Sequence, residues 1–205
     1  MFDLPLPARV ATIAAFGYAA GCLNAGYYLV RARRRTDLRN LHSGNAGATN
    51  AGRVLGRRAF ALVLMLDAAK GALAAAVGQW LAGPPGGAVG ALTAISGHIW
   101  PIQLAFRGGR GIATAIGAFL LIEPLATLAS GGLALALFAA TRRWSASGLA
   151  AVLAAPVIAW LLGRPAGMIG AIGLAAATVL FAHRDDVARL RRRLAAGGPG
   201  ADASA

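Results

Sequence analysis

The stretch that decides the fold covers residues 112–141 and reads IATAIGAFLLIEPLATLASGGLALALFAAT. A single helix of these residues would measure about 45 Å at about 1.5 Å per residue, which is too long for a bilayer core of roughly 30 Å. Glu123 and Pro124 lie near its middle, and Arg142 and Arg143 follow directly. The stretch is therefore either one over-long span or a hairpin of two short helices.

The distribution of arginine decides between these alternatives. The other apolar runs cover residues 10–30, 59–82, 88–106, 147–163 and 167–182. With a hairpin at 112–141 the chain has seven spans, and every arginine except Arg9 and Arg164 falls on one side of the membrane. A single span would weaken this asymmetry. Because positively charged residues gather on the cytoplasmic side, we predict seven helices, some of them short, with the N-terminus outside and the C-terminus in the cytoplasm.

The composition favours a membrane protein over a soluble domain. Hydrophobic residues make up 58% of the chain and charged residues only 13%, so there are too few polar side chains to cover a globular surface. A net charge of +13 suggests nucleic acid or an anionic membrane as partner, and the hydrophobicity selects the membrane and not nucleic acid. We predict an all-α integral membrane bundle, formed as one domain by residues 1–194 and followed by a disordered tail over residues 195–205.

Glycine is about twice as frequent as its usual ~7%, with 28 residues in the chain. This frequency is typical of tight helix packing or of backbone that approaches a ligand closely. Gly17 with Gly21, and Gly163 with Gly167, have the spacing of small residues at helix–helix contacts. We interpret both pairs as packing positions.

Two polar, glycine-rich segments fall on the same cytoplasmic face in this topology. The first reads SGNAGATNAGR over residues 43–53 and combines flexible backbone, neutral donors and the positive charge of Arg53. The second contains GHIWP at residues 97–101 and FRGGRGIAT at residues 106–114, where glycines flank Arg110 just before a predicted helix. Either segment alone is equally typical of an interhelical turn. Their shared face predicts an anion-binding site.

Two further groups of polar residues accompany these segments. Asp67 and Lys70 lie inside an apolar run at i and i+3, a spacing that predicts a buried ion pair facing the bundle interior or a site. His183, Arg184 and Asp186 follow the last span. The sequence shows no zinc motif, serine-hydrolase elbow, P-loop or His-x-x-x-x-Asp acyltransferase motif, and it indicates neither a metal nor a cofactor. Anion binding at a membrane surface remains.

Taken together, these motifs resemble the PlsY family of bacterial acyl-phosphate:glycerol-3-phosphate acyltransferases. The resemblance covers nearly the whole chain, in the right order, and fits the seven spans reached from hydropathy and charge. The motifs that carry it lie at residues 43–53, 67–71, 97–114 and 183–190.

The resemblance implies that acyl phosphate and glycerol 3-phosphate react to give 1-acyl-glycerol 3-phosphate and inorganic phosphate. It also implies a groove open to membrane lipid and to the cytoplasm, in the bacterial inner membrane, and a departing phosphate that accepts the hydroxyl proton. The implied catalytic residues are Ser43, Arg53, His98, Arg110, His183 and Asp186. The implied substrate-binding residues are Gly44, Asn45, Gly47, Thr49, Asn50, Lys70, Gly108, Gly109 and Gly111.

The chain departs from the family pattern at two of these positions. Arg110 stands where the family usually has lysine, and Asp186 stands where it has asparagine. The family also has a serine before its sixth helix, a place that Ser145 or Ser147 can fill. An inactive family member and a transporter of a phosphorylated anion are the two alternative functions. Acyl-chain preference and oligomeric state, a monomer included, stay open.

Overall fold

The computed structural model describes residues 4–184, apart from the side chain of Ser145. Asp186 and the predicted tail over residues 195–205 lie outside the described residues. Within the described part every regular element is helical, which confirms the all-α prediction. The elements are α1 (Leu6–Cys22), α2 (Ala25–Arg34), η1 (Leu38–Asn40), α3 (Ala48–Leu55), α4 (Arg57–Ile99), η2 (Ile102–Leu104), α5 (Ile112–Ile122), α6 (Pro124–Thr141), α7 (Trp144–Leu161) and α8 (Ala166–Ala182).

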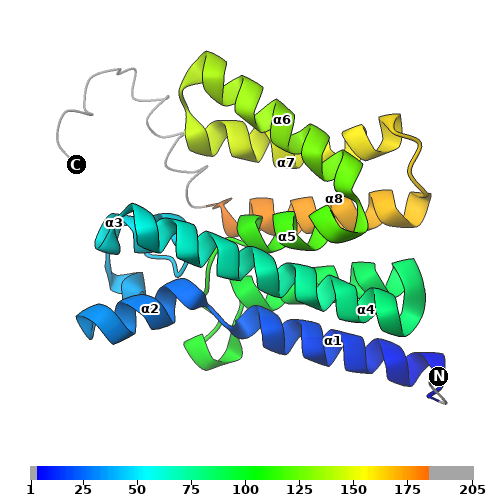
Figure 1. Cartoon of the computed structure of the whole chain (residues 1–205), viewed down its shortest axis with the longest axis horizontal. Helices are drawn as coiled ribbons and strands as arrows, with labels where there is room; N and C mark the ends of the chain where they lie inside the picture. The colour runs from blue at the N-terminus through cyan, green and yellow to red at the C-terminus, as the bar shows by residue number, and fades with distance from the viewer. Residues whose placement is uncertain (1–3, 185–205) are drawn as a thin grey trace.

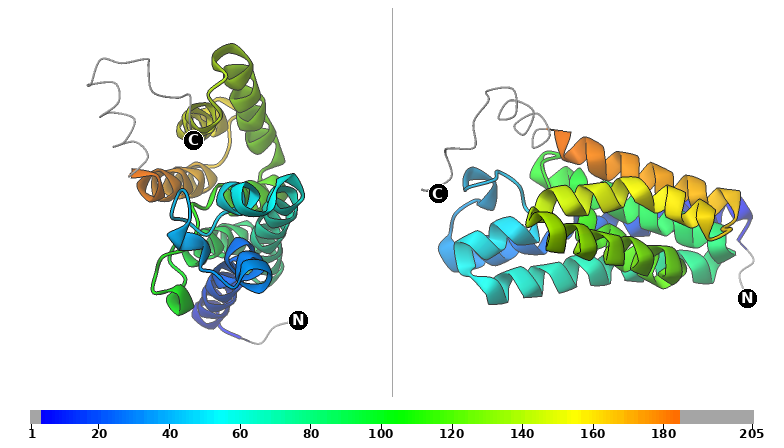
Figure 2. Two further views of the ribbon diagram at one scale, coloured as in Figure 1. Left: turned by 90° about the vertical axis from the view of Figure 1, so that its left-hand side faces the viewer. Right: turned by 90° about the horizontal axis from the view of Figure 1, so that it is seen from above.

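Seven helical rods run back and forth along the long axis of the described part (Figures 1 and 2). Two of them belong to α4, which turns back on itself at Ala82 and Gly83. Gly83 has φ 66° and ψ −161°, a combination that a residue with a Cβ rarely adopts, and Pro84 begins the returning half. The predicted hairpin over residues 112–141 is also confirmed, because α5 and α6 meet at Glu123.

Two of the predicted spans have wrong boundaries. The first span breaks between α1 and α2, where Asn24 is buried and donates from Nδ2 to the Cys22 carbonyl at 3.2 Å. The third span ends at Ile99 and does not continue to residue 106, because the residue before Pro101 disfavours the α conformation. The polar segment between the first two spans contains a short helix, α3.

Glycine lets the inner helices approach to backbone contact. A Cβ at Gly21 would lie 2.2 Å from the Ala94 carbonyl oxygen, so α1 packs directly on the returning half of α4. A Cβ at Gly71 would lie 2.1 Å from the Thr114 oxygen, so the first half of α4 packs on α5 in the same way. The packing role predicted for Gly17 and Gly21 is thus confirmed. That predicted for Gly163 and Gly167 was wrong, since nothing lies within 4 Å of either position.

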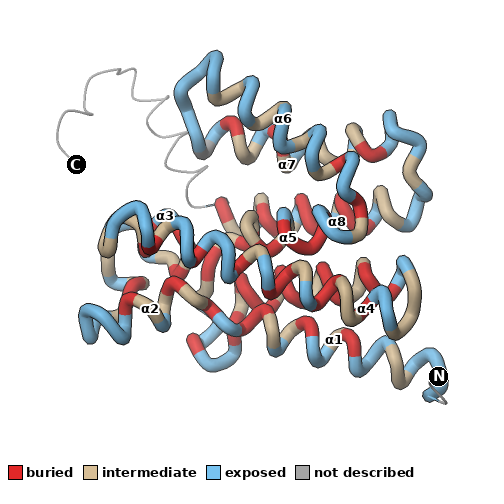
Figure 3. The backbone as a smooth tube through the Cα atoms, viewed as in Figure 1, coloured by how far each residue is buried: buried red, intermediate tan, exposed pale blue. Residues whose placement is uncertain are grey.

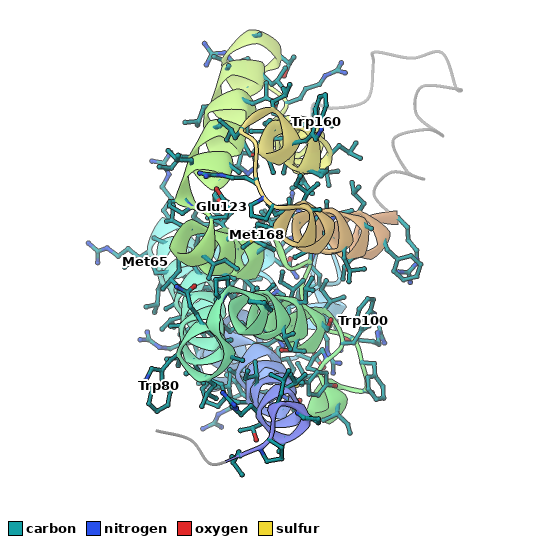
Figure 4. All side chains as sticks on the ribbon, turned by 90° about the vertical axis from the view of Figure 1, so that its right-hand side faces the viewer. Met65, Trp80, Trp100, Glu123, Trp160 and Met168 are labelled. Atoms are coloured by element: carbon teal, nitrogen blue, oxygen red, sulfur yellow. The ribbon has the colours of Figure 1, made fainter. Side chains whose placement is uncertain are left out.

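The core sits between α4, α5 and α8, where Ile95, Phe119, Ile172 and Val179 are buried together (Figure 3). α6 and α7 contribute Ala126 and Ala159 to this core, and α6 is otherwise largely exposed, as a lipid-facing helix is. Three helical stretches are long and apolar enough to cross a bilayer, and three shorter apolar helices accompany them. Trp80 and Trp160 project outward at one end of the bundle, as membrane-interface aromatics do (Figure 4).

Candidate active site

A pocket of about 230 Å³ lies where the two glycine-rich segments meet the end of α8. Its walls come from three parts of the chain that are far apart in sequence, as predicted from the shared face of the two segments. Figure 2 (left) looks along the bundle from this end. The lining residues are Ser43, Gly44, Asn45, Ile99, Trp100, Phe106, Arg107, Gly108, Gly109, Arg110, Ala182 and Arg184.

Asn50 holds the first segment in shape. Its side chain is fully buried, and the two N–H groups of Nδ2 are shared among three backbone carbonyls, among them that of Asn45 at 2.8 Å. Its Oδ1 accepts the Ser43 amide at 3.4 Å. The Asn45 side chain closes the next turn by accepting the Gly47 amide at 2.9 Å. Because its amide is used in these bonds, Asn50 acts on the pocket through the loop that carries Ser43.

The Ser43 hydroxyl is oriented by this loop. Asn45 donates from Nδ2 to Ser43 Oγ at 3.0 Å. A hydroxyl that accepts a hydrogen bond keeps its own proton available as a donor. Ser43 can therefore donate to an oxygen atom inside the pocket.

The second segment is tied to the first by one backbone hydrogen bond, and to the residues just before the first segment by Arg39. The Ala46 amide donates to the Gly108 carbonyl at 3.1 Å. Arg39 donates from Nη1 to the Leu104 carbonyl at 2.6 Å and pairs through Nη2 with Asp37 at 2.7 Å. The hydrogen bonds from Arg39 hold the pKa of the Asp37 carboxyl below its usual value. The Arg39 guanidinium thus joins the Asp37 carboxylate to the Leu104 carbonyl and holds the two parts of the chain together.

His98 lies directly behind the second segment. Its carbonyl accepts the Gly109 amide at 3.0 Å, and a Cβ at Gly109 would lie 2.1 Å from its Nε2. On the other side of the ring, Nδ1 lies 2.8 Å from Lys70 Nζ. Lys70 also pairs with Asp67 at 2.8 Å, which confirms the predicted ion pair. These three side chains are buried and do not line the pocket.

The other predicted residues occupy different places. Thr49 and Arg53 are exposed on α3, outside the pocket lining. Gly111 has φ 83° and precedes the first residue of α5. His183 is buried between the lining residues Ala182 and Arg184, with Nδ1 2.7 Å from the Val179 carbonyl oxygen.

Ser147 offers no hydroxyl to the pocket, because it bonds the Arg143 carbonyl at 3.0 Å on α7.

Sequence reasoning missed several residues that line the pocket. Arg107 lies within the second predicted segment and Arg184 beside His183, but neither was named as a site residue. Trp100 and Phe106 provide aromatic surface beside them. Among the described residues the lining includes three arginines and no carboxylate. In the same part of the chain no three His, Cys, Asp or Glu side chains are grouped as metal ligands.

These features define a helical membrane protein with a cationic, glycine-walled pocket at one end of its bundle, a class suited to anionic headgroups. A family model described as glycerol-3-phosphate acyltransferase matches residues 11–193. Glycerol-3-phosphate acyltransferase 1 of Desulfitobacterium hafniense (strain Y51) is 43% identical over 171 residues, covering 83% of this chain and 85% of that protein. The glycerol-3-phosphate acyltransferase of Methylorubrum populi is 40% identical over 196 residues, covering 95% and 93%.

Two crystal structures of PlsY (YgiH), described as an integral membrane glycerol 3-phosphate acyltransferase, have the same fold. The glycerol 3-phosphate form has a TM-score of 0.84 and 29% identity, covering 89% of this chain and 92% of that one. The lysophosphatidic acid form has a TM-score of 0.81 and 27% identity over the same shares. The chain belongs to the glycerol-3-phosphate acyltransferase family and is an integral membrane enzyme of that family.

Proposed function

We propose that this chain transfers a fatty acyl group from acyl phosphate to glycerol 3-phosphate, giving 1-acyl-glycerol 3-phosphate and inorganic phosphate. The observation that supports this most is the pocket itself, in which three arginines and two glycine-rich loops converge and no described carboxylate is present. Both substrates carry a phosphate group. Their mutual repulsion is the first barrier that such an enzyme has to lower.

Arginine suits this task because its planar guanidinium can bind a phosphate through two parallel hydrogen bonds. Arg107 and Arg110 come from one loop and Arg184 from the end of α8, so cationic groups approach the pocket from two elements. The Ser43 hydroxyl, held by Asn45, donates to a phosphate oxygen of the acyl donor. The acyl chain of the bound donor then extends along the apolar side of the pocket, which is formed by Ile99, Trp100 and Phe106.

The chemical step requires no protein base. The 1-hydroxyl oxygen of glycerol 3-phosphate attacks the acyl carbonyl carbon, and the bond between this carbon and the phosphate oxygen breaks. The departing phosphate takes the hydroxyl proton, so atoms and charge balance without an added reactant. The chain contributes positioning and charge neutralisation, which supply large rate enhancements when two reactants are held together.

The remaining predicted residues have roles at a distance from the reacting atoms in this proposal. Asn50 and His98 shape the two loops, and Arg53 on the exposed face of α3 attracts anions toward the pocket. The His183 ring bonds the Val179 carbonyl and so fixes the end of α8, from which Arg184 extends into the pocket lining. Replacing Asp186 by asparagine tests whether the carboxylate slows the reaction, since a carboxylate repels phosphate.

We further propose that the pocket faces the cytoplasm from the bacterial inner membrane. The described arginines other than Arg9 and Arg164 lie on elements at the pocket end of the bundle (Figure 1). This asymmetry is the one that positions a membrane protein with its basic side inside. The N-terminus then lies outside.

The test uses purified protein with palmitoyl phosphate and follows phosphate release with and without glycerol 3-phosphate. We expect phosphate release that depends on the acceptor. With palmitoyl-CoA in place of the acyl phosphate, we expect neither free CoA thiol nor 1-acyl-glycerol 3-phosphate. Ser43→Ala and Arg110→Ala should each abolish turnover, and Arg33→Ala, an exposed arginine on α2, serves as the matched control. Absence of acceptor-dependent release in every detergent and pH tried would mean that this is an inactive member or a transporter.

A further inference from the structure

We infer that Lys70, held by Asp67, is a positioning residue that fixes the His98 imidazole and, through it, the Gly108–Gly109 segment of the pocket. The inference rests on the proposed function, because this segment matters for turnover only if the pocket binds the substrates. It replaces the predicted role of Lys70 as a direct substrate contact.

The first argument is that protein groups already engage the Lys70 ammonium group. An ammonium group has three N–H donors. Its Nζ lies 2.8 Å from Asp67 Oδ1, 2.8 Å from His98 Nδ1 and 2.7 Å from the Leu23 carbonyl oxygen. The ammonium group is therefore engaged by two hydrogen bonds, to His98 and Leu23, and by the ion pair with Asp67. Lys70 is also absent from the pocket lining, so its influence on the pocket passes through a neighbour.

The second argument concerns the proton on His98. An ammonium group can only donate, so the ring nitrogen facing it must be the acceptor. The neutral ring then carries its proton on Nε2, the nitrogen that faces Gly109. Lys70 therefore selects one tautomer and one orientation of the ring. Without Lys70, the Asp67 carboxylate, whose Oδ1 is 3.6 Å from Nδ1, is the partner left to the ring and favours a proton on Nδ1.

The third argument is that the ring supports the pocket wall. The Gly109 amide donates to the His98 carbonyl and the Gly108 amide to the Ile99 carbonyl, both at 3.0 Å, so the loop runs along the last turn of α4. The imidazole fills the space where a Gly109 side chain would be. A ring that tilts or changes its protonated nitrogen therefore shifts backbone that lines the pocket.

A purely structural role for the pair is the competing explanation. Lys70 bonds the Leu23 carbonyl, and the Ala25 amide lies against the Asp67 carboxylate, so the pair also satisfies backbone groups at the break between α1 and α2. Loss of this role lowers stability but leaves the chemistry of the folded fraction unchanged. The two explanations therefore differ in what a folded variant can still do.

The experiment first reads the tautomer directly. The chain has three histidines, His42, His98 and His183, so histidine labelled with ¹⁵N gives three ring systems that single His→Gln variants assign. We expect His98 in the neutral form with its proton on Nε2, and a change of this signal in Lys70→Met. A proton on Nδ1 in the wild-type protein would overturn the inference whether or not the protein is active.

The second measurement separates positioning from stability. Asp67→Asn combined with Lys70→Met removes both charges, and we expect it to recover most of the melting temperature lost in Lys70→Met. Its kcat/KM for acyl transfer should stay lowered by about 10- to 100-fold, as for other residues that orient a site residue. The matched control is Glu123→Gln with Arg164→Met, which removes an ion pair of 2.7 Å at the far end of the bundle and should leave kcat/KM unchanged.

A folded Asp67→Asn/Lys70→Met variant with the kcat and KM of the wild type would overturn the inference and leave the proposed function standing. Failure of the proposed function has a different signature, because the wild-type protein itself would then release no phosphate in response to glycerol 3-phosphate. In that case the tautomer measurement still decides the arrangement of Lys70 and His98.

Discussion

Replacing Gly109 by alanine places a methyl group against the imidazole of His98. The added Cβ would lie 2.1 Å from Nε2, 2.7 Å from Cε1 and 3.0 Å from Cδ2. Ordinary contact begins near 3.4 Å, so the loop and the ring have to separate by about 1.3 Å. Lys70 holds Nδ1 of the ring at 2.8 Å, and the ring is buried. The loop therefore gives way, and the pocket wall that continues into Arg110 moves with it.

A displacement of this size is large for an active site and modest for the fold. Misplacing a positioning group by about 1 Å can cost about 100-fold in rate, whereas one extra methyl in a packed interior costs about 1–3 kcal/mol of stability. We expect Gly109→Ala to lower kcat/KM by about 100-fold while the melting temperature falls by about 2–12 °C. Phosphate release from palmitoyl phosphate with glycerol 3-phosphate, and thermal unfolding in the same detergent, are the two assays.

Gly132→Ala on α6 is the control, because nothing lies within 4 Å of the position its Cβ would take. This variant should match the wild-type protein in both assays. A Gly109→Ala protein whose kcat/KM stays within about threefold of the wild-type value would show that the loop does not depend on contact with His98.

Three further predictions follow from contacts outside the His98 ring. Asn50→Ala removes the amide that bonds three carbonyls around the Ser43 loop, so kcat/KM should fall more than about tenfold. The helix content measured by circular dichroism should stay unchanged. Normal turnover would contradict the role of Asn50 in holding the loop. Arg164→Met leaves buried Glu123 without its cation and should lower the free energy of unfolding by about 2 kcal/mol, while kcat at 25 °C is retained. The loss is smaller than for a fully buried pair because Arg164 is partly exposed. An unchanged melting temperature would refute this prediction. The lowered pKa of Asp37 means that its pairing with Arg39 stabilises the fold above the unfolded carboxyl pKa of about 3.9 and is lost as pH falls through the lower folded value. Asp37→Asn should therefore reduce thermal stability at about pH 7 but not at about pH 2, and equal loss at both would exclude this pairing as the cause.

Hydropathy and charge predicted the number of spans because the bilayer imposes a length on each helix and a sign on each loop. The hairpin at Glu123 follows from these two constraints alone, since one helix of residues 112–141 fits neither. The meeting of residues 43–45 with residues 106–110 follows from counting spans, which places both loops at one end. The fold and the location of the pocket were therefore predictable.

The ends of helices inside apolar sequence were not predictable in the same way. The break at Leu23 and the helix end at Ile99 lie within runs that are apolar on either side, so hydropathy does not change there. Only the Trp100-Pro101 pair offered a signal, because a residue before proline disfavours the helix. Spacing alone also misjudged Gly163 and Gly167, since the same pattern serves a turn with no packing partner.

The roles of individual site residues depend on which element passes behind the loop, and the sequence does not contain that information. Glycines beside an arginine predict backbone that approaches an anion, yet a Cβ at Gly108 would lie 2.1 Å from the His98 carbonyl oxygen. Close packing against α4 therefore requires glycine here even before a ligand is considered. The glycine loop satisfies two demands at once, contact with α4 behind and an open pocket in front.

The division of labour between lysine and arginine follows from the shapes of their charged groups. Lys70 is the chain's single lysine, and it lies where a buried cation has to reach Asp67 within its own helix turn, Leu23 at the α1–α2 break and His98 on the returning half of α4. A compact ammonium group with three diverging donors can meet three such acceptors, whereas a planar guanidinium would direct its donors into one plane. At the pocket the demand is reversed, because a phosphate offers pairs of oxygens to a planar donor, and every cation that lines the described pocket is an arginine. A +1 charge therefore joins groups of three helical segments at Lys70 and binds anions at the pocket arginines, and the geometry of the N–H donors decides which of the two roles it has.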